Sequence, residues 1–193
     1  PTSQSEDGYA GKCLKLTTVS TGFLGSMFGA PIAAGNLFIG DFSIDMSNAA
    51  KSTHFGRPFK KLPKMLSGYY KYKAGPKFQD KNKKEIKDGK DSLAIYAILF
   101  ETGDGVEYLD GTNSLTSDRI VLLAQLKGAK EADEWTHFEI PFETVAGRVI
   151  DSEKLKNGQY SLSIIMSSSK EGAIFKGAIG STLYVDELKL YSE

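Results

Sequence analysis

The sequence predicts an all-β domain, a jelly-roll β-sandwich of about eight strands. Apolar and polar residues alternate with period two in one segment after another, as they do in strands that bury one face. Turn-forming residues separate these segments, and no stretch carries a convincing amphipathic helical pattern. With 193 residues the chain is long enough to bury one core, so a single domain over residues 1–193 is expected.

The N-terminal part is expected to hold a lead-in, a strand, a loop and a second strand. Residues 1–9 are polar and are predicted to form a flexible lead-in. Residues 12–19 alternate as a half-buried strand does. Residues 22–40 mix large apolar side chains with Gly and Pro, which predicts an apolar, glycine-rich loop that lies against the sandwich. This loop is expected to run into a strand over residues 36–44.

The next predicted strand, residues 65–73, is rich in tyrosine. In an extended chain Tyr70 and Tyr72 share one face, whereas Tyr69 and Lys71 share the opposite face. The sequence alone does not say which of these faces is buried.

The rest of the chain is predicted to be mainly strand. Residues 77–92 carry mixed charges and are expected to form a long solvated loop. Four further strands are expected over residues 92–100, 120–127, 135–142 and 159–168. The first two are apolar on both faces, which is typical of central strands that are covered on both sides. Helix is limited to single turns at residues 129–133 and 152–155.

The closing strand, residues 182–190, contains a change of phase. Leu183 and Val185 alternate correctly, but the apolar residues after Glu187 are displaced by one position. A β-bulge at Asp186 and Glu187 would restore the register, and a bulge can redirect a carboxylate.

Composition argues against several classes of partner. The 24 basic residues balance 24 acidic ones, so we expect no binding to nucleic acid or to anionic lipid. The single cysteine, Cys13, excludes an internal disulfide. The longest apolar run, residues 93–100, is too short to insert into a membrane. The chain begins with Pro1, so an upstream segment is expected to have been removed.

Aromatic rings on a sandwich surface can stack on sugar rings while Lys and Glu side chains hydrogen-bond the hydroxyls. Candidate ligand-binding residues on this basis are Tyr69, Tyr70, Tyr72, Lys71, Trp135 and Glu139. An alternative remains open: tyrosine is a good strand former, and a lone Trp at a strand start often closes the rim of a core.

Metal binding and catalysis leave weaker signals. Asp186 could hold a structural Ca²⁺ together with Asp7 or with carboxylates of residues 110–118, although Asp-Gly pairs also simply form turns. His54 and His137 lack the spacing of a zinc site, and no cofactor is expected. Glycoside hydrolysis needs two carboxylates about 5 to 10 Å apart, which the sequence cannot pair, so no catalytic residue is assigned.

Four blocks together resemble one known family. They are residues 33–38, 55–59, 66–73 and 172–186. The family is the putative carbohydrate metabolism domain (PCMD) of surface and secreted proteins of Gram-negative bacteria, and the similarity extends from Gly8 to Tyr191. It implies a β-sandwich akin to carbohydrate-binding modules in an exported protein, located at the cell surface, in the periplasm or outside the cell.

The resemblance brings no established catalytic residues. The tyrosines of the 66–73 block and Asp186 match family hallmarks. A Trp-containing N-terminal stretch that is usual in the family is absent, so an N-terminal part of the family domain is expected to be missing.

Three hypotheses follow for function. The first is a non-catalytic glycan-binding module that recognises a saccharide or polysaccharide. The second is a glycoside hydrolase or lyase that acts on polysaccharide. The third is a structural or adhesive surface domain that packs against a neighbouring domain of the same protein; exposed Phe and Met side chains within residues 22–40 would support it.

Overall fold

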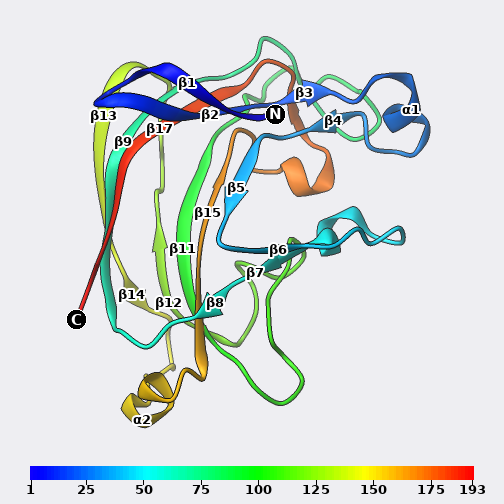
Figure 1. Ribbon diagram of the computed structural model, residues 1–193. Helices are drawn as coiled ribbons and strands as arrows, with labels where there is room; N and C mark the ends of the chain where they lie inside the picture. The colour runs from blue at the N-terminus through cyan, green and yellow to red at the C-terminus, as the bar shows by residue number, and fades with distance from the viewer.

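The computed structural model describes residues 1–193 and consists mostly of antiparallel β-strands. Two sheets lie face to face with the core between them (Figure 1). This arrangement confirms the predicted all-β class. No helix is both long and apolar enough to cross a membrane.

The first sheet has five strands in the order β1-β2-β17-β9-β13. Their bounds are β1 Thr2–Gly8, β2 Gly11–Thr17, β17 Thr182–Ser192, β9 Pro63–Lys73 and β13 Ala132–Pro141. The prediction of a flexible lead-in over residues 1–9 is wrong, because β1 pairs with β2 at the sheet edge. Most residues of this edge strand are exposed, so the sequence carries no alternating apolar pattern that would reveal it.

The second sheet has six strands, with β14-β12-β11-β15-β5 in order and β8 also paired with β15. Their bounds are β14 Glu143–Thr144, β12 Ile120–Gln125, β11 Ala94–Glu101, β15 Tyr160–Ser167, β5 Asn36–Phe38 and β8 Arg57–Pro58. The four strands predicted between residues 92 and 168 are all present as β11, β12, β13 and β15.

The main core lies between the sheets and contains 20 buried residues. It includes Leu16 and Leu66 from the five-stranded sheet and Leu99 and Leu162 from the six-stranded sheet. A second cluster of seven buried residues, among them Tyr96, lies on the outer face of the six-stranded sheet. The central strands of the six-stranded sheet are therefore covered on both faces, as their sequence predicts.

Short elements decorate the sandwich. The paired strands are β3 Val19–Ser20 with β4 Ile32–Ala33, β6 Gly40–Phe42 with β7 Thr53–Phe55, and β10 Phe78–Gln79 with β16 Gly177–Ala178. The helical turns are α1 Gly22–Met27, η1 Ala49–Ser52, α2 Ser152–Lys156 and η2 Gly172–Ile174. Of the two predicted single turns, the one at residues 152–155 is present as α2.

The predicted strand over residues 36–44 is divided in two. β5 pairs with β15, whereas β6 leaves the main sheet and pairs with β7. Gly40 permits this change of course, because a Cβ at this position would collide with the carbonyl oxygen of His54.

The expectation that residues 22–40 lie against the sandwich is wrong for their first half. Helix α1 has no buried residue and projects from one end of the molecule (Figure 1). The large apolar side chains here are exposed, with Phe23 in α1 at 80% and Phe28, directly after it, at 79%. Composition shows that this segment is apolar, but it does not show whether the segment packs against the sandwich.

The predicted bulge in β17 is confirmed. Its register against β9 shifts between Asp186 and Lys189, and Glu187 has a φ of 48°. The Asp186 carboxylate accepts backbone N–H bonds from Ala10 at 2.9 Å and from Glu187 at 2.8 Å. Asp186 therefore joins the bulge to the β1–β2 turn.

Candidate functional site

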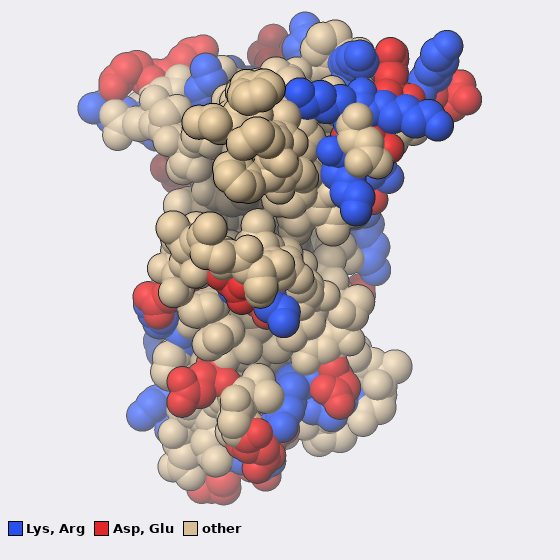
Figure 2. All heavy atoms as spheres, turned by 90° about the vertical axis from the view of Figure 1, so that its right-hand side faces the viewer, with Lys and Arg blue, Asp and Glu red and all other residues tan.

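A cavity of about 890 Å³ opens on the outer face of the six-stranded sheet. The segments that supply its walls lie at the right-hand side of Figure 1, near α1 on one side and in β6 and β7 on the other. Figure 2 views the molecule from that side and shows the hollow between two bodies of mostly uncharged atoms. A volume of this size is within the range of sites that hold small molecules.

The floor of the cavity is built from cross-strand neighbours. One row across the sheet contains Gln125, Tyr96, Ile165 and Phe38, and the next contains Ala94, Ser167 and Asn36. Because side chains alternate along a strand, the residues between them point into the core and these point outward. The floor is therefore fixed by four paired strands, with β11 and β15 in the middle and β5 at the edge.

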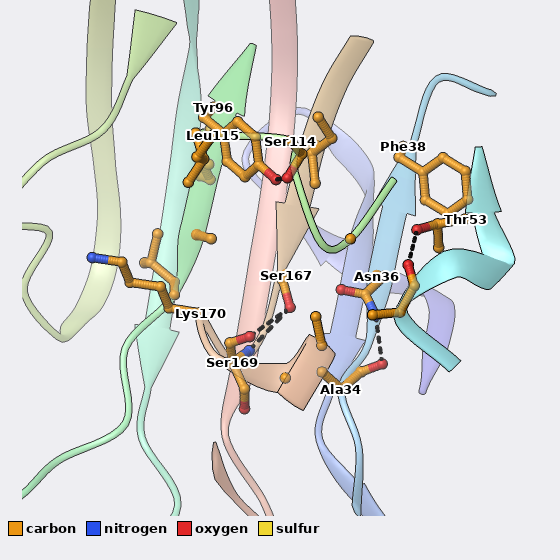
Figure 3. Close-up of a pocket in the computed structure, with 18 of the residues that line it drawn as sticks. Ala34, Asn36, Phe38, Thr53, Tyr96, Ser114, Leu115, Ser167, Ser169 and Lys170 are labelled. Atoms are coloured by element: carbon orange, nitrogen blue, oxygen red, sulfur yellow. Dashed lines mark hydrogen bonds between the residues drawn. The ribbon is translucent and has the colours of Figure 1, made fainter. Parts of the chain in front are cut away.

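Hydrogen bonds hold two of the polar floor groups in place. The hydroxyls of Tyr96 and Ser114 are 2.8 Å apart, and burial raises the pKa of Tyr96. The Ser167 hydroxyl donates to the carbonyl of Ser169 at 2.9 Å. Figure 3 shows these pairs on opposite sides of the opening. They orient hydroxyl groups around a floor that is otherwise largely apolar.

Asn36 supplies an amide at the edge of the floor. Its Nδ2 donates to the carbonyl of Ala34 at 3.1 Å. Its amide oxygen is directed toward the cavity, as Figure 3 shows, and Asn36 is exposed. This oxygen can accept a hydrogen bond from a bound ligand.

The walls come from loops on two sides. One wall contains Thr21 and Ala30 beside α1 together with residues 169–175 after β15. The facing wall contains the β6–β7 hairpin and residues 111–116, with Phe42 65% exposed at the mouth. The mouth therefore presents apolar side chains.

Charge in the lining is limited to two lysines, Lys127 and Lys170. The 34 lining residues include no Asp or Glu, so this cavity does not itself contain the pair of carboxylates on which glycoside hydrolysis usually depends. It offers rings, methyl groups, hydroxyls and amides, the groups that hold a ligand by contact and hydrogen bonding.

A buried carboxylate braces one wall. Asp91, just before β11, accepts bonds from the Ser169 hydroxyl at 2.6 Å, the Ala178 N–H at 2.7 Å and the Ser181 hydroxyl at 2.7 Å. Its other oxygen accepts from the N–H of Ser92 at 2.9 Å. Sequence reasoning missed this residue, because its partners Ser169, Ala178 and Ser181 lie 78, 87 and 90 positions away in the chain.

Tyr70 and Tyr72 do not form a surface platform. Their rings are 6% and 3% exposed and belong to the main core. The Tyr70 hydroxyl donates to the carbonyl of Lys130 at 3.3 Å, and the Tyr72 hydroxyl donates to that of Ser168 at 3.2 Å. The prediction that they stack on a sugar is therefore wrong, because their phase along β9 is the phase of the core residue Leu66.

The structure brings Tyr69, Lys71 and Trp135 together on the outer face of the five-stranded sheet, away from the cavity. Tyr69 stacks on Tyr9 with ring centroids 3.8 Å apart and an interplanar angle of 11°. The Lys71 Nζ lies 4.9 Å from the centre of the Trp135 ring. These side chains contact one another and pin the β1–β2 turn to the sheet. Glu139 is exposed, farther along β13.

The set of ligands predicted for calcium at Asp186 is not assembled. No group of three His, Cys, Asp or Glu residues is close enough to hold a metal ion. Asp186 uses both carboxylate oxygens for backbone N–H groups, and Asp7 is paired with Lys71 at 3.7 Å.

Comparisons with known proteins relate this chain to carbohydrate metabolism. No curated protein matches it. A crystal structure from Bacteroides thetaiotaomicron, described as a putative glycoside hydrolase, is 51% identical, with a TM-score of 0.97. A second, from Bacteroides vulgatus and described in the same words, is 46% identical, with a TM-score of 0.93.

The relatives are longer than this chain. The whole chain is covered in both comparisons, but it spans 57% of the first relative and 78% of the second. A family model for the putative carbohydrate metabolism domain matches residues 1–191. With nearly every residue matched and the sandwich shared with these relatives, the chain belongs to the PCMD family.

Proposed function

We propose that this chain is a non-catalytic glycan-binding module with a jelly-roll sandwich, and that the cavity on the six-stranded sheet holds the saccharide. The observation that carries the proposal is a preformed cavity of about 890 Å³ on a floor of paired strands. A saccharide presents C–H faces and hydroxyl groups together, and the floor offers rings and hydrogen-bonding groups side by side.

Specific residues can be assigned to these roles. Phe38 and Phe42 offer ring surface, with Phe42 at the mouth. Asn36 and Gln125 offer amide groups, and Ser114 offers a hydroxyl already oriented by Tyr96. A rigid floor lowers the entropic cost of binding because few groups have to be ordered when the ligand arrives.

The absence of Asp and Glu from the lining supports binding rather than hydrolysis within this cavity. The related crystal structures are described as putative glycoside hydrolases, and this chain spans only part of each. Hydrolysis is therefore the alternative in which carboxylates outside the cavity, in this domain or in another part of a longer protein, act on the same polysaccharide. Release of reducing sugar by the chain alone, abolished by one acidic substitution, would support that alternative.

The test is a glycan array followed by calorimetry on the intact chain. Ala94→Trp places a large ring on the cavity floor without touching the main core and should abolish binding. Tyr69→Ala is the matched control, because it removes a ring from the opposite sheet and should leave binding unchanged. Retained binding in Ala94→Trp together with lost binding in Tyr69→Ala would move the site to the other face.

A second candidate function is favoured by the exposed apolar side chains of α1 and of Phe28, which follows it. Phe23, Leu24, Met27 and Phe28 are between 61% and 80% exposed. We infer that they pack against a further domain of the same polypeptide, because the related chains contain residues beyond the shared sandwich. In the crystal structures of the two relatives, the equivalent side chains should be covered by the remainder of the chain. Full exposure there would refute this candidate.

An exported location is the final part of the proposal, and its support is the family resemblance. Fractionation of cells that produce the natural full-length protein should recover it from the envelope or the medium. Recovery only with cytoplasmic markers would contradict an exported role.

A further inference from the structure

We propose that the saccharide held in this cavity is acidic, with carboxylate or sulfate groups. This inference rests on the proposed function and adds a ligand class to it. Its basis is the sign of the charge at the site: among the 34 lining residues the two charged side chains are both lysines, Lys127 and Lys170.

The two lysines flank the same end of the cavity. Lys127 follows the last residue of β12 by two positions, and the N–H of Leu126 beside it donates to the carbonyl of Ile95 at 2.9 Å. The N–H of Lys170 donates to the carbonyl of Ser92 at 2.7 Å. Both backbones are therefore fixed next to the start of β11, one on each side of it.

Neither ammonium group pairs with a carboxylate of this chain, although neighbouring lysines do. Lys176 pairs with Glu171 at 2.8 Å, in the segment that follows Lys170. The nearby carboxylate of Asp91 is buried and already accepts four hydrogen bonds within the protein. The positive charge at this end of the cavity is thus left for a ligand.

Position sets which part of the ligand the lysines would contact. Both are exposed, and Figure 3 shows the Lys170 side chain extending away from the floor residues. The lysines therefore act at the rim, where they attract an anionic substituent while the uncharged floor receives the sugar ring. Interactions of exposed charges weaken as salt rises, since the screening length falls to about 8 Å at physiological ionic strength.

The test compares ligands and variants that differ only in charge. The probes are polygalacturonate and its fully methyl-esterified form, with alginate and chondroitin sulfate as further acidic polymers and galactan as a neutral one. Binding to each is measured for the intact chain and for Lys127→Gln, Lys170→Gln and the double variant. Lys61→Gln is the matched control, because Lys61 is exposed, makes no ion pair and lies outside the cavity.

The expected result is preference for at least one acidic polymer, weakened by added salt and by each lysine variant. A rim contact predicts a loss of roughly two- to fivefold for each lysine. Equal or tighter binding of the neutral polymers, or binding that ignores both lysines, would overturn the inference while the proposed function stands. If neither these polymers nor any glycan on the array binds, the proposed function itself fails.

Discussion

Replacing Asp91 by alanine tests how the wall of the cavity is held. The substitution removes the acceptor of four hydrogen bonds in a site that is 5% exposed. A buried donor left without a partner costs about 1–3 kcal/mol. The two hydroxyls can rotate, and Ser169 already lies 2.6 Å from the Thr18 hydroxyl. The backbone N–H groups of Ser92 and Ala178 have no such freedom.

The losses are partly offset because removing the carboxylate also removes the cost of burying a charge. Counting the two fixed N–H groups in full and the hydroxyls in part, we expect the free energy of unfolding to fall by about 3–4 kcal/mol. For a chain of this size that corresponds to a decrease in Tm on the order of 10 °C.

Urea unfolding followed by circular dichroism and by the fluorescence of the single tryptophan, Trp135, measures this loss. Asp91→Asn keeps one acceptor oxygen and should be destabilised less than Asp91→Ala. Asp88→Ala is the matched control, because Asp88 is exposed in the same segment and should change stability by no more than about 0.5 kcal/mol. A loss below about 1 kcal/mol in Asp91→Ala would refute the bracing role.

Three further predictions concern the core, the tyrosines and α2. Leu66→Ala should lower the free energy of unfolding by about 2–5 kcal/mol in urea titrations, because Leu66 is fully buried; a loss below about 1 kcal/mol would contradict this packing. Burial raises the pKa of Tyr72 and Tyr96 above 10. Their contribution to the free energy of unfolding is therefore complete below pH 10 and is lost as pH rises above it. In an ultraviolet titration of the folded chain both should ionise only above pH 10, and complete ionisation of all nine tyrosines by pH 10 would contradict this. Backbone N–H bonds from Lys154 and Glu153 lower the pKa of Asp151 from 3.8. Its contribution to the free energy of unfolding is therefore present above pH 3.8 and is lost as pH falls further. The free energy of unfolding measured against pH should fall less on acidification in Asp151→Ala than in the original chain, and an unchanged profile would argue against the cap.

The sandwich was predictable because a strand that buries one face alternates apolar and polar residues, whereas a strand that buries both faces is apolar throughout. β11 and β12 are apolar on both faces, and the structure covers them on both faces. The bulge at Asp186 was predictable for the same reason, since a one-residue phase shift has few structural solutions. β1 escaped prediction because an exposed edge strand carries no such signal.

The cavity could not be predicted from the sequence. Its lining is drawn from Thr21 through Phe175, and the loops that form its walls have no periodicity. Alternation assigned Tyr70 and Tyr72 to one face correctly, but it could not say which face points inward. Which face of β9 is buried depends on the pairing of β9 with β13 and β17, which only the folded chain supplies.

The most direct test of the glycan-binding proposal is a ¹⁵N-resolved NMR titration with a saccharide retained on the array. Binding in the cavity should shift the side-chain amide of Asn36 and the backbone amides of Tyr96 and Ser167, while the indole N–H of Trp135 stays in place. A shift of the Trp135 indole with no change at Asn36 would place the ligand on the five-stranded sheet and contradict binding in the cavity.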